Sequence, residues 1–103
     1  MDIGEILIAM GMAPSMAGFH EMIAAVEEYQ TNHTVIQGDV CEALSKKFGT
    51  NSANIYRRLH YAVNKINPDT DVYREYIGNN RVPLSEFTSI LGYRTREKGK
   101  NND

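Results

Sequence analysis

The sequence predicts a compact all-α domain of six helices that contains a helix-turn-helix. Apolar residues recur at helical spacing in successive segments of the 103-residue chain, and glycines and prolines fall between these segments. No stretch alternates apolar and polar residues over the length of a strand. A chain that is 42% hydrophobic and 23% charged is typical of a soluble globular domain rather than of a disordered segment.

The first two helices are delimited by capping and breaking residues. We expect the first helix over residues 3–10, because the Asp2 side chain can cap it and Gly11 and Pro14 stop it. The second helix is expected to begin at Pro14 or Ser15 and to run to about Gln30. Its inward positions at helical spacing are Phe19, Met22, Ile23 and Val26.

The third and fourth helices form the predicted helix-turn-helix at about residues 38–66. The third helix is expected from Gly38 or Asp39 to Phe48, with Gly49 as its left-handed terminating residue. Its inward residues are predicted to be Val40, Ala43, Leu44 and Phe48. Ser52 can cap a fourth helix from Ala53 to about Ile66. That helix has the clearest periodicity in the chain, with apolar residues at Ile55, Leu59, Ala62, Val63 and Ile66.

Two further helices complete the predicted domain, which covers residues 1–93. A fifth helix is expected over residues 71–77, because Asn67-Pro68 precedes it and Gly78 follows it. The sixth begins near Pro83 or Leu84, with Phe87, Ile90 and Leu91 inward. Residues 94–103 are rich in charge and lack an apolar anchor, so we expect a flexible tail there.

The charges of the chain are segregated along the sequence. Residues 1–42 contain seven acidic residues and no lysine or arginine, whereas residues 43–103 contain all eleven basic residues against six acidic ones. The second part therefore has a net charge of +5, although the whole chain has a net charge of −2. Nucleic-acid binding needs a basic face rather than a basic average, so this segregation favours a DNA-binding function.

Other classes of function find little support in the sequence. One cysteine, Cys41, and three scattered histidines give no basis for a metal site, and we expect no metal and no cofactor. We expect no enzymatic activity, because no phosphate-binding loop, nucleophile elbow or paired catalytic carboxylates occur. The uncharged residues 6–19 follow acidic residues and are broken by Gly11 and Pro14, so they fit neither a signal peptide nor a membrane span. A cytoplasmic protein is expected, located at the nucleoid when it binds DNA.

The candidate functional residues lie on the outer face of the fourth helix, on its flank and at the end of the third helix. If its apolar stripe is buried, its opposite face is free to enter a DNA major groove. Arginine can donate two hydrogen bonds to guanine, and asparagine can pair with adenine. The predicted base contacts are Asn54, Arg57, Tyr61 and Asn64. The predicted phosphate contacts, which would fix the register without reading the sequence, are Lys46, Lys47, Ser52, Arg58 and Lys65.

Five segments of the chain form a distinctive set: Ile3-Gly4-Glu5-Ile6-Leu7, Gly11-Met12-Ala13-Pro14, Gly18-Phe19, Ala43-Leu44-Ser45-Lys46-Lys47-Phe48-Gly49-Thr50 and Pro83-Leu84-Ser85-Glu86-Phe87. Through these segments the chain, from about Ile3 to Arg96, resembles the C-terminal effector domain of the stage-zero sporulation protein A family, the response regulators of endospore formation. Ile55, Arg57, Leu59 and Ala62-Val63 fit the family's recognition helix.

The resemblance implies a six-helix domain that binds operator DNA through its fourth helix as a tandem pair and contacts RNA polymerase sigma subunits. In full-length members a receiver domain precedes this one, and we expect none here, so that the chain would be either an excised part of a longer protein or a stand-alone protein. We favour a stand-alone protein, because the residues before Ile3 resemble a natural start. The chain departs from the family pattern at Asn54, Tyr56, His60 and Tyr61. A changed reading surface would redirect or relax the sequence preference.

A protein-interaction module is the alternative interpretation. Such a module would modulate a full-length regulator or a sigma factor without binding DNA. Its motivating feature is the acidic character of residues 1–42, which would repel DNA and attract a basic partner. A continuous positive strip around Arg57 would favour DNA binding, whereas acidic side chains from residues 21–42 that intrude on the fourth helix would favour the alternative.

Overall fold

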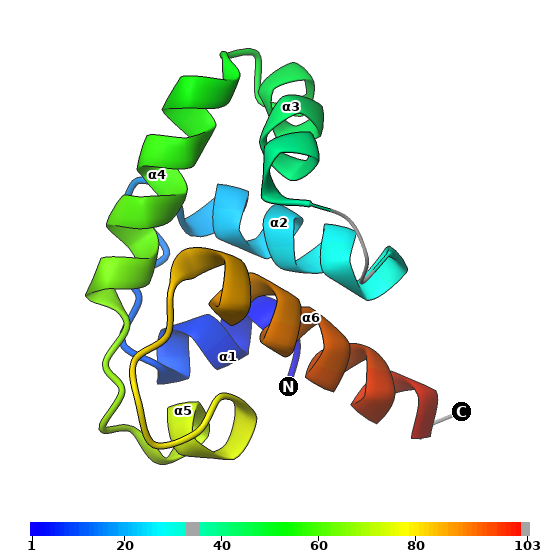
Figure 1. Ribbon diagram of the computed structural model, residues 1–103. Coiled ribbons are helices and arrows are strands. Elements are labelled where there is room, and N and C mark those ends of the chain that lie inside the picture. Colours follow the sequence, from blue (N-terminus) through cyan, green and yellow to red (C-terminus); the bar gives the residue numbers. More distant parts are fainter. Residues whose placement is uncertain (33–35, 102–103) are drawn as a thin grey trace.

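The computed structural model describes residues 1–32 and 36–101, with side chains up to Arg96. The described residues form helices and connecting turns without a strand, which confirms the all-α prediction. The six helices are α1 (Ile3–Ala9), α2 (Phe19–Thr31), α3 (Gln37–Lys47), α4 (Ser52–Lys65), α5 (Asp71–Tyr76) and α6 (Leu84–Asn101) (Figure 1).

Helix α2 is the central element of the fold. It packs against α1, α3, α4 and α6, so that most of the apolar side chains converge on it. Met22 and Val26 of α2 are fully buried, as are Leu7 of α1, Leu59 of α4 and Leu91 of α6. Burying a side chain of this size contributes about 1.5–3 kcal/mol, so this shared core fixes α4 relative to the other helices.

Helix α1 begins as the sequence predicts, but α2 does not. Asp2 caps α1 in a capping box, in which its side chain accepts from the Glu5 backbone and Glu5 accepts from the Asp2 backbone. Helix α2 starts at Phe19, not at Pro14 or Ser15, because Gly18 precedes it with a left-handed φ of 90°. A Cβ atom on Gly18 would lie 2.3 Å from the carbonyl oxygen of Arg58. The start of α2 therefore rests directly on the backbone of α4.

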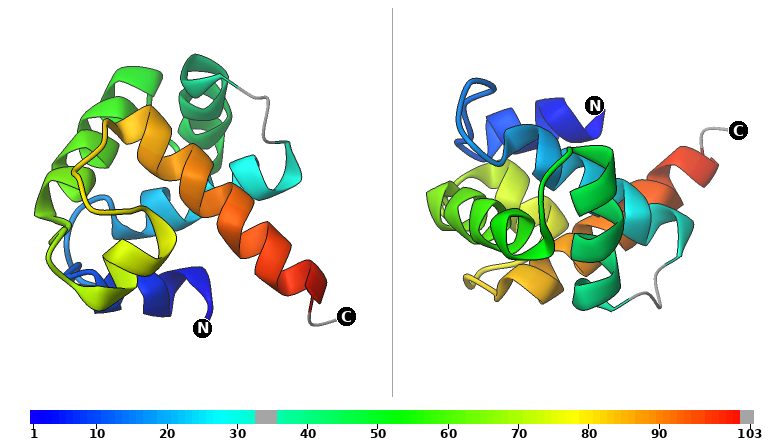
Figure 2. Two further views of the ribbon diagram at one scale, coloured as in Figure 1. Left: turned by 60° about the horizontal axis from the view of Figure 1, so that its bottom comes forward. Right: turned by 90° about the horizontal axis from the view of Figure 1, so that it is seen from above.

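Helices α3 and α4 are joined by the four-residue turn 48–51 and lie next to each other (Figure 2, right). Gly49 has a φ of 65°, which confirms its predicted left-handed role, and the Thr50 N–H donates to the Ser45 carbonyl across the end of α3. The predicted Ser52 cap is wrong, because the Asn51 side chain accepts from the Asn54 N–H at 2.8 Å and Ser52 is the first residue of α4.

The inner face of α3 differs from the prediction at one position. Val40 and Leu44 are buried and Phe48 packs at the edge of the core, as expected. Ala43 is exposed, and Cys41 and Ser45 are buried in its place. These positions follow the i, i+4 spacing from Val40 and Cys41 to Leu44 and Ser45, so the buried stripe is rotated away from Ala43.

Hydrogen bonds to residues earlier and later in the sequence hold the C-terminal end of α4 in place. Arg81, which precedes α6, donates to the carbonyl oxygens of Val63 at 3.4 Å and Ile66 at 3.1 Å. The N–H of Asn67 donates to the Met10 carbonyl at 2.7 Å, which joins the end of α4 to the end of α1. The last carbonyls of a helix have few partners within it, and the Val63 carbonyl otherwise accepts from the Ile66 N–H at 3.2 Å, so these added bonds stabilise the end of α4.

Helix α6 continues beyond the predicted domain boundary. Residues 94–101 of the expected tail are helical in backbone, and Gln30 Nε2 donates to Thr95 Oγ1 at 2.7 Å. Residues 102–103 of that tail lie outside the described residues. Ile90, predicted inward, is only half-buried, whereas Phe87 and Leu91 are buried. None of the described helices combines the length and the apolar character that a membrane crossing requires.

Candidate nucleic-acid interface

One face of α4 is buried in the core and the opposite face is exposed. Ile55, Leu59 and Ala62 have no accessible surface, whereas Tyr56 and Tyr61 are about half exposed. The helix lies at one edge of the molecule, with its outer side uncovered by the other helices (Figure 1). The exposed residues on that outer side include three of the four predicted base contacts and one predicted phosphate contact: Arg57, Tyr61, Asn64 and Lys65.

Arg57 is exposed, and an asparagine one turn earlier fixes its position. Its Nη2 atom donates to Oδ1 of Asn54, and the Asn54 Nδ2 atom donates to Thr50 Oγ1 at 2.9 Å. Asn54 is half-buried, and both the oxygen and the nitrogen of its amide are hydrogen-bonded. In this arrangement Asn54 orients Arg57, and it would have to release these partners before it could contact a base.

Tyr61 and Lys65 form a pair on the same outer face. The Lys65 Nζ atom lies 5.1 Å from the centroid of the Tyr61 ring, within the range of a cation–π interaction. Tyr56 makes a similar local contact, with its ring centroid 4.3 Å from that of His60. The exposed surface of α4 therefore combines cations with flat aromatic rings.

The predicted phosphate contact Arg58 is engaged within the molecule. Its Nη1 atom lies 2.9 Å from Oε2 of Glu21, a residue in the first turn of α2. The Glu21 side chain is 11% exposed and the Arg58 side chain 40% exposed. This pair binds α2 to α4 at the side of the outer face.

Ser52, Lys46 and Lys47 lie around the turn between α3 and α4. Ser52 donates its hydroxyl hydrogen to Glu42 Oε2 at 2.8 Å, so its hydroxyl is bonded to an acidic side chain. Lys46 and Lys47 are exposed in the last turn of α3, where positive charge is favoured by the helix dipole. The Lys47 Nζ atom lies 5.9 Å from the Phe48 ring centroid.

Two surface hollows flank Arg57. One, of about 380 Å³, lies beside the start of α2 and is lined by Ala17, Asn54, Arg57, Arg58 and Tyr61. The other, of about 450 Å³, lies between α3 and α4 and is lined by Gln37, Gly38, Cys41, Ser52, Ala53, Tyr56 and Arg57. Arg57 therefore stands on a ridge between two hollows, one of which contains a second arginine.

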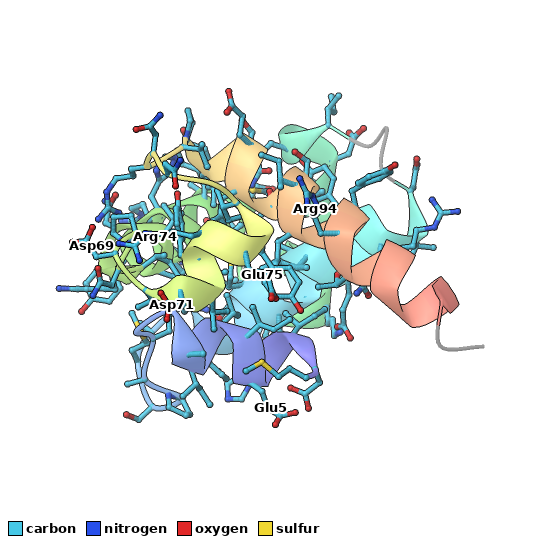
Figure 3. The ribbon with its side chains drawn as sticks, turned by 90° about the horizontal axis from the view of Figure 1, so that it is seen from below. Glu5, Asp69, Asp71, Arg74, Glu75 and Arg94 are labelled. Carbon is cyan, nitrogen blue, oxygen red and sulfur yellow. The ribbon has the colours of Figure 1, made fainter. Side chains whose placement is uncertain are left out.

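Acidic side chains reach the flanks of α4 but not the middle of its outer face. Glu21 pairs with Arg58, and Glu42 accepts a hydrogen bond from Ser52. Within the described part of the chain, no carboxylate pairs with Arg57 or Lys65. The side of the molecule formed by α1, α5 and part of α6 has mixed charge, with Glu5, Asp69, Asp71, Glu75, Arg74 and Arg94 (Figure 3). The cations at the centre of the outer face of α4 therefore have no acidic partner among the residues that the structure describes, whereas acidic side chains lie at its flanks.

Two residues that line the hollow between α3 and α4, Gln37 and Cys41, have buried polar groups. Tyr29 donates its hydroxyl hydrogen to Gln37 Oε1 at 3.0 Å, and the Gln37 Nε2 atom is buried without a partner. Burial raises the pKa of the Tyr29 hydroxyl and that of the Cys41 thiol. Among the described residues, no group of three or more His, Cys, Asp or Glu side chains is placed to hold a metal ion.

Four residues that hold the outer face in place, Thr50, Asn51, Glu21 and Glu42, are not among the predicted site residues. Asn51 and Thr50 act through Asn54, and their position just before the helix is a recognisable capping pattern. Glu21 and Glu42 carried no such signal, since their partners are 37 and 10 residues away in the chain.

Comparison of the chain with models of protein families, with curated proteins and with solved structures gives no match.

Proposed function

We propose that this chain is a sequence-specific DNA-binding transcription regulator that inserts α4 into the major groove as the second helix of a helix-turn-helix. The observation that carries the proposal is the two-sided character of α4. Its Ile55 and Leu59 side is buried, while Arg57, Asn64 and Lys65 are exposed on the other side. A helix of 14 residues is about 21 Å long, enough to lie along several base pairs of a groove.

The arrangement around α4 supports this proposal in two ways. Arg57 is oriented by Asn54 toward the exposed side, which suits two hydrogen bonds to a guanine edge. Lys46 and Lys47 are exposed at the end of α3, which suits phosphate contacts beside the groove. The resemblance to the sporulation regulators adds, as part of the same proposal, a role in sporulation, tandem binding to an operator and contact with a sigma subunit.

The proposal is tested by fluorescence anisotropy on a labelled duplex, first of random sequence and then of a sequence selected from a randomised library. Affinity is expected to fall steeply with salt, because cations that contact phosphates displace condensed counterions. Lys47→Ala should weaken binding to both duplexes equally. Arg94→Ala, which removes an exposed charge from the side shown in Figure 3, serves as the matched control and should leave binding unchanged.

Binding that is undetectable at low ionic strength, or that does not change with salt, would contradict the proposal. An equal effect of Lys47→Ala and Arg94→Ala would show that net charge, and not the surface around α4, determines the affinity.

A second candidate function is a protein-interaction module that modulates a full-length regulator or a sigma factor. The observation that favours it is the intrusion of Glu21 and Glu42 at the two flanks of α4. A pull-down with purified regulator or polymerase, performed beside the duplex titration, separates the two candidates. Capture of either protein without any duplex binding would support the module and contradict DNA binding.

A further inference from the structure

We propose that Glu21 limits the affinity of α4 for nucleic acid by withholding the charge of Arg58. The inference rests on the proposed DNA-binding function and identifies a residue, outside the helix itself, that sets its strength. Arg58 was expected to bind a phosphate like the neighbouring lysines, but the structure gives its guanidinium an internal partner.

The contact between Glu21 and Arg58 is close and well supported. Oε2 of Glu21 lies 2.9 Å from Nη1 of Arg58, and the Glu21 side chain is only 11% exposed. The two residues are held in register because Gly18, three residues before Glu21, lies against the carbonyl of Arg58. The hydrogen bond from Arg58 is the one that satisfies the Glu21 carboxylate in the described structure.

This geometry makes it unfavourable for Arg58 to exchange Glu21 for a phosphate. Removing the counterion of a nearly buried carboxylate costs much free energy, because little water can reach the carboxylate to replace its partner. An exposed contact between an arginine and a phosphate contributes less favourable free energy, because solvent and salt screen it. Arg58 is therefore expected to keep Glu21 as its partner when α4 meets DNA.

A neutralised arginine contributes little to the salt dependence of binding. Each phosphate neutralised by a free cation adds about 0.9 to the slope of log affinity against log salt. The pair formed by Glu21 and Arg58 has no net charge, so its share of the slope should be close to zero. The slope should then come from the predicted phosphate contacts that have no acidic partner in the described part of the chain, which are Lys65 on α4 and the two lysines at the end of α3.

The test is the salt slope of duplex binding for wild type and Glu21→Gln. The glutamine keeps the volume of the side chain and can still accept from Arg58, but it carries no charge. We expect tighter binding and a slope steeper by about 0.9, so that the gain shrinks about eightfold for each tenfold increase in salt. Glu21→Ala removes the same charge and is used if the glutamine variant does not fold.

Two controls distinguish the release of Arg58 from the general effect of removing one negative charge from the protein. Glu27→Gln removes an exposed acid from the same helix and should leave the slope unchanged. In the background of Arg58→Gln, Glu21→Gln should bring no gain, because the charge it would release is absent. An unchanged slope in Glu21→Gln, or the same gain with and without Arg58, would overturn the inference while wild-type binding still supports the proposed function. If wild type itself shows no salt-dependent binding, both fall together.

Discussion

Arg57 is the exposed arginine of α4 whose partner is neutral. It is bonded to Asn54, while its neighbour Arg58 is bonded to the carboxylate of Glu21. Two consecutive arginines therefore have different environments, because successive residues of a helix point about 100° apart. Arg57 is bonded to a neutral amide and has no acidic partner among the described residues, and Arg58 links α4 to α2 through Glu21.

Replacing Arg57 should therefore affect the reading of sequence more than the general affinity. We expect Arg57→Ala to lower affinity for the selected duplex by about 1–3 kcal/mol and to change affinity for a random duplex much less. Competition anisotropy with both duplexes measures the difference. Arg57→Lys keeps the charge without the two parallel donors, so it should lose most of the same discrimination. An equal loss on both duplexes would assign Arg57 to phosphate contact instead.

At the scale of the elements, the crossing of α2 and α6 depends on Gly92. A Cβ atom at Gly92 would lie 2.6 Å from Cβ of Tyr29 and 3.0 Å from the carbonyl oxygen of Val26. The two helices therefore approach each other through backbone as well as side chains. No other residue type fits at position 92 unless the helices move apart.

Gly92→Ala should lower the free energy of unfolding by about 1–3 kcal/mol, because steric overlap at the crossing outweighs the better helix propensity of alanine. Urea denaturation followed by circular dichroism measures the change. Gly38→Ala is the matched control, since a Cβ atom there meets nothing within 4 Å and α3 is helical. It should be neutral or slightly stabilising. Equal stability of Gly92→Ala and wild type would show that the crossing can relax.

The existence of the helices could be predicted from local signals, whereas some of their limits could not. The Asp2 cap and the glycine at position 49 act on residues close to them in the sequence, so the local sequence is sufficient to predict them. The start of α2 is set by Gly18, whose conformation is coupled to the carbonyl of Arg58, 40 residues further on. The pairing of Glu21 with Arg58 is of the same kind. Helical spacing could identify the exposed side of α4, but not which of its cations has an internal acid.

At the scale of the whole molecule, the free energy of folding depends on pH through two buried side chains with raised pKa, the Cys41 thiol and the Tyr29 hydroxyl. Burial raises the pKa of Cys41 from its ordinary value of 9.0 and that of Tyr29 from 10.0. The folded protein therefore keeps protons that the unfolded chain releases at alkaline pH. The stabilising contribution is complete below these ordinary values and is lost as pH rises through the higher values of the folded state.

We therefore expect the free energy of unfolding to decrease as pH rises above about 9, first through Cys41 and then through Tyr29. Urea titrations between pH 7.5 and 10.5 measure this decrease. Cys41→Ala should remove the first part of the pH dependence, whatever its effect on stability at neutral pH. A free energy of unfolding that is constant across this range, or one that rises with pH, would contradict the coupling.

The contacts in the middle and at the C-terminal end of α4 determine how the molecule can adapt to a partner. Gly18 lies against its second turn, and Arg81 and the Asn67 amide join its last residues to the rest of the chain. With these contacts, α4 can neither shift along its axis nor tilt independently of the other helices. Any induced fit must then come from the bending of the duplex or from rotamer changes of surface groups, and the polypeptide should dock as one rigid body with little loss of backbone entropy.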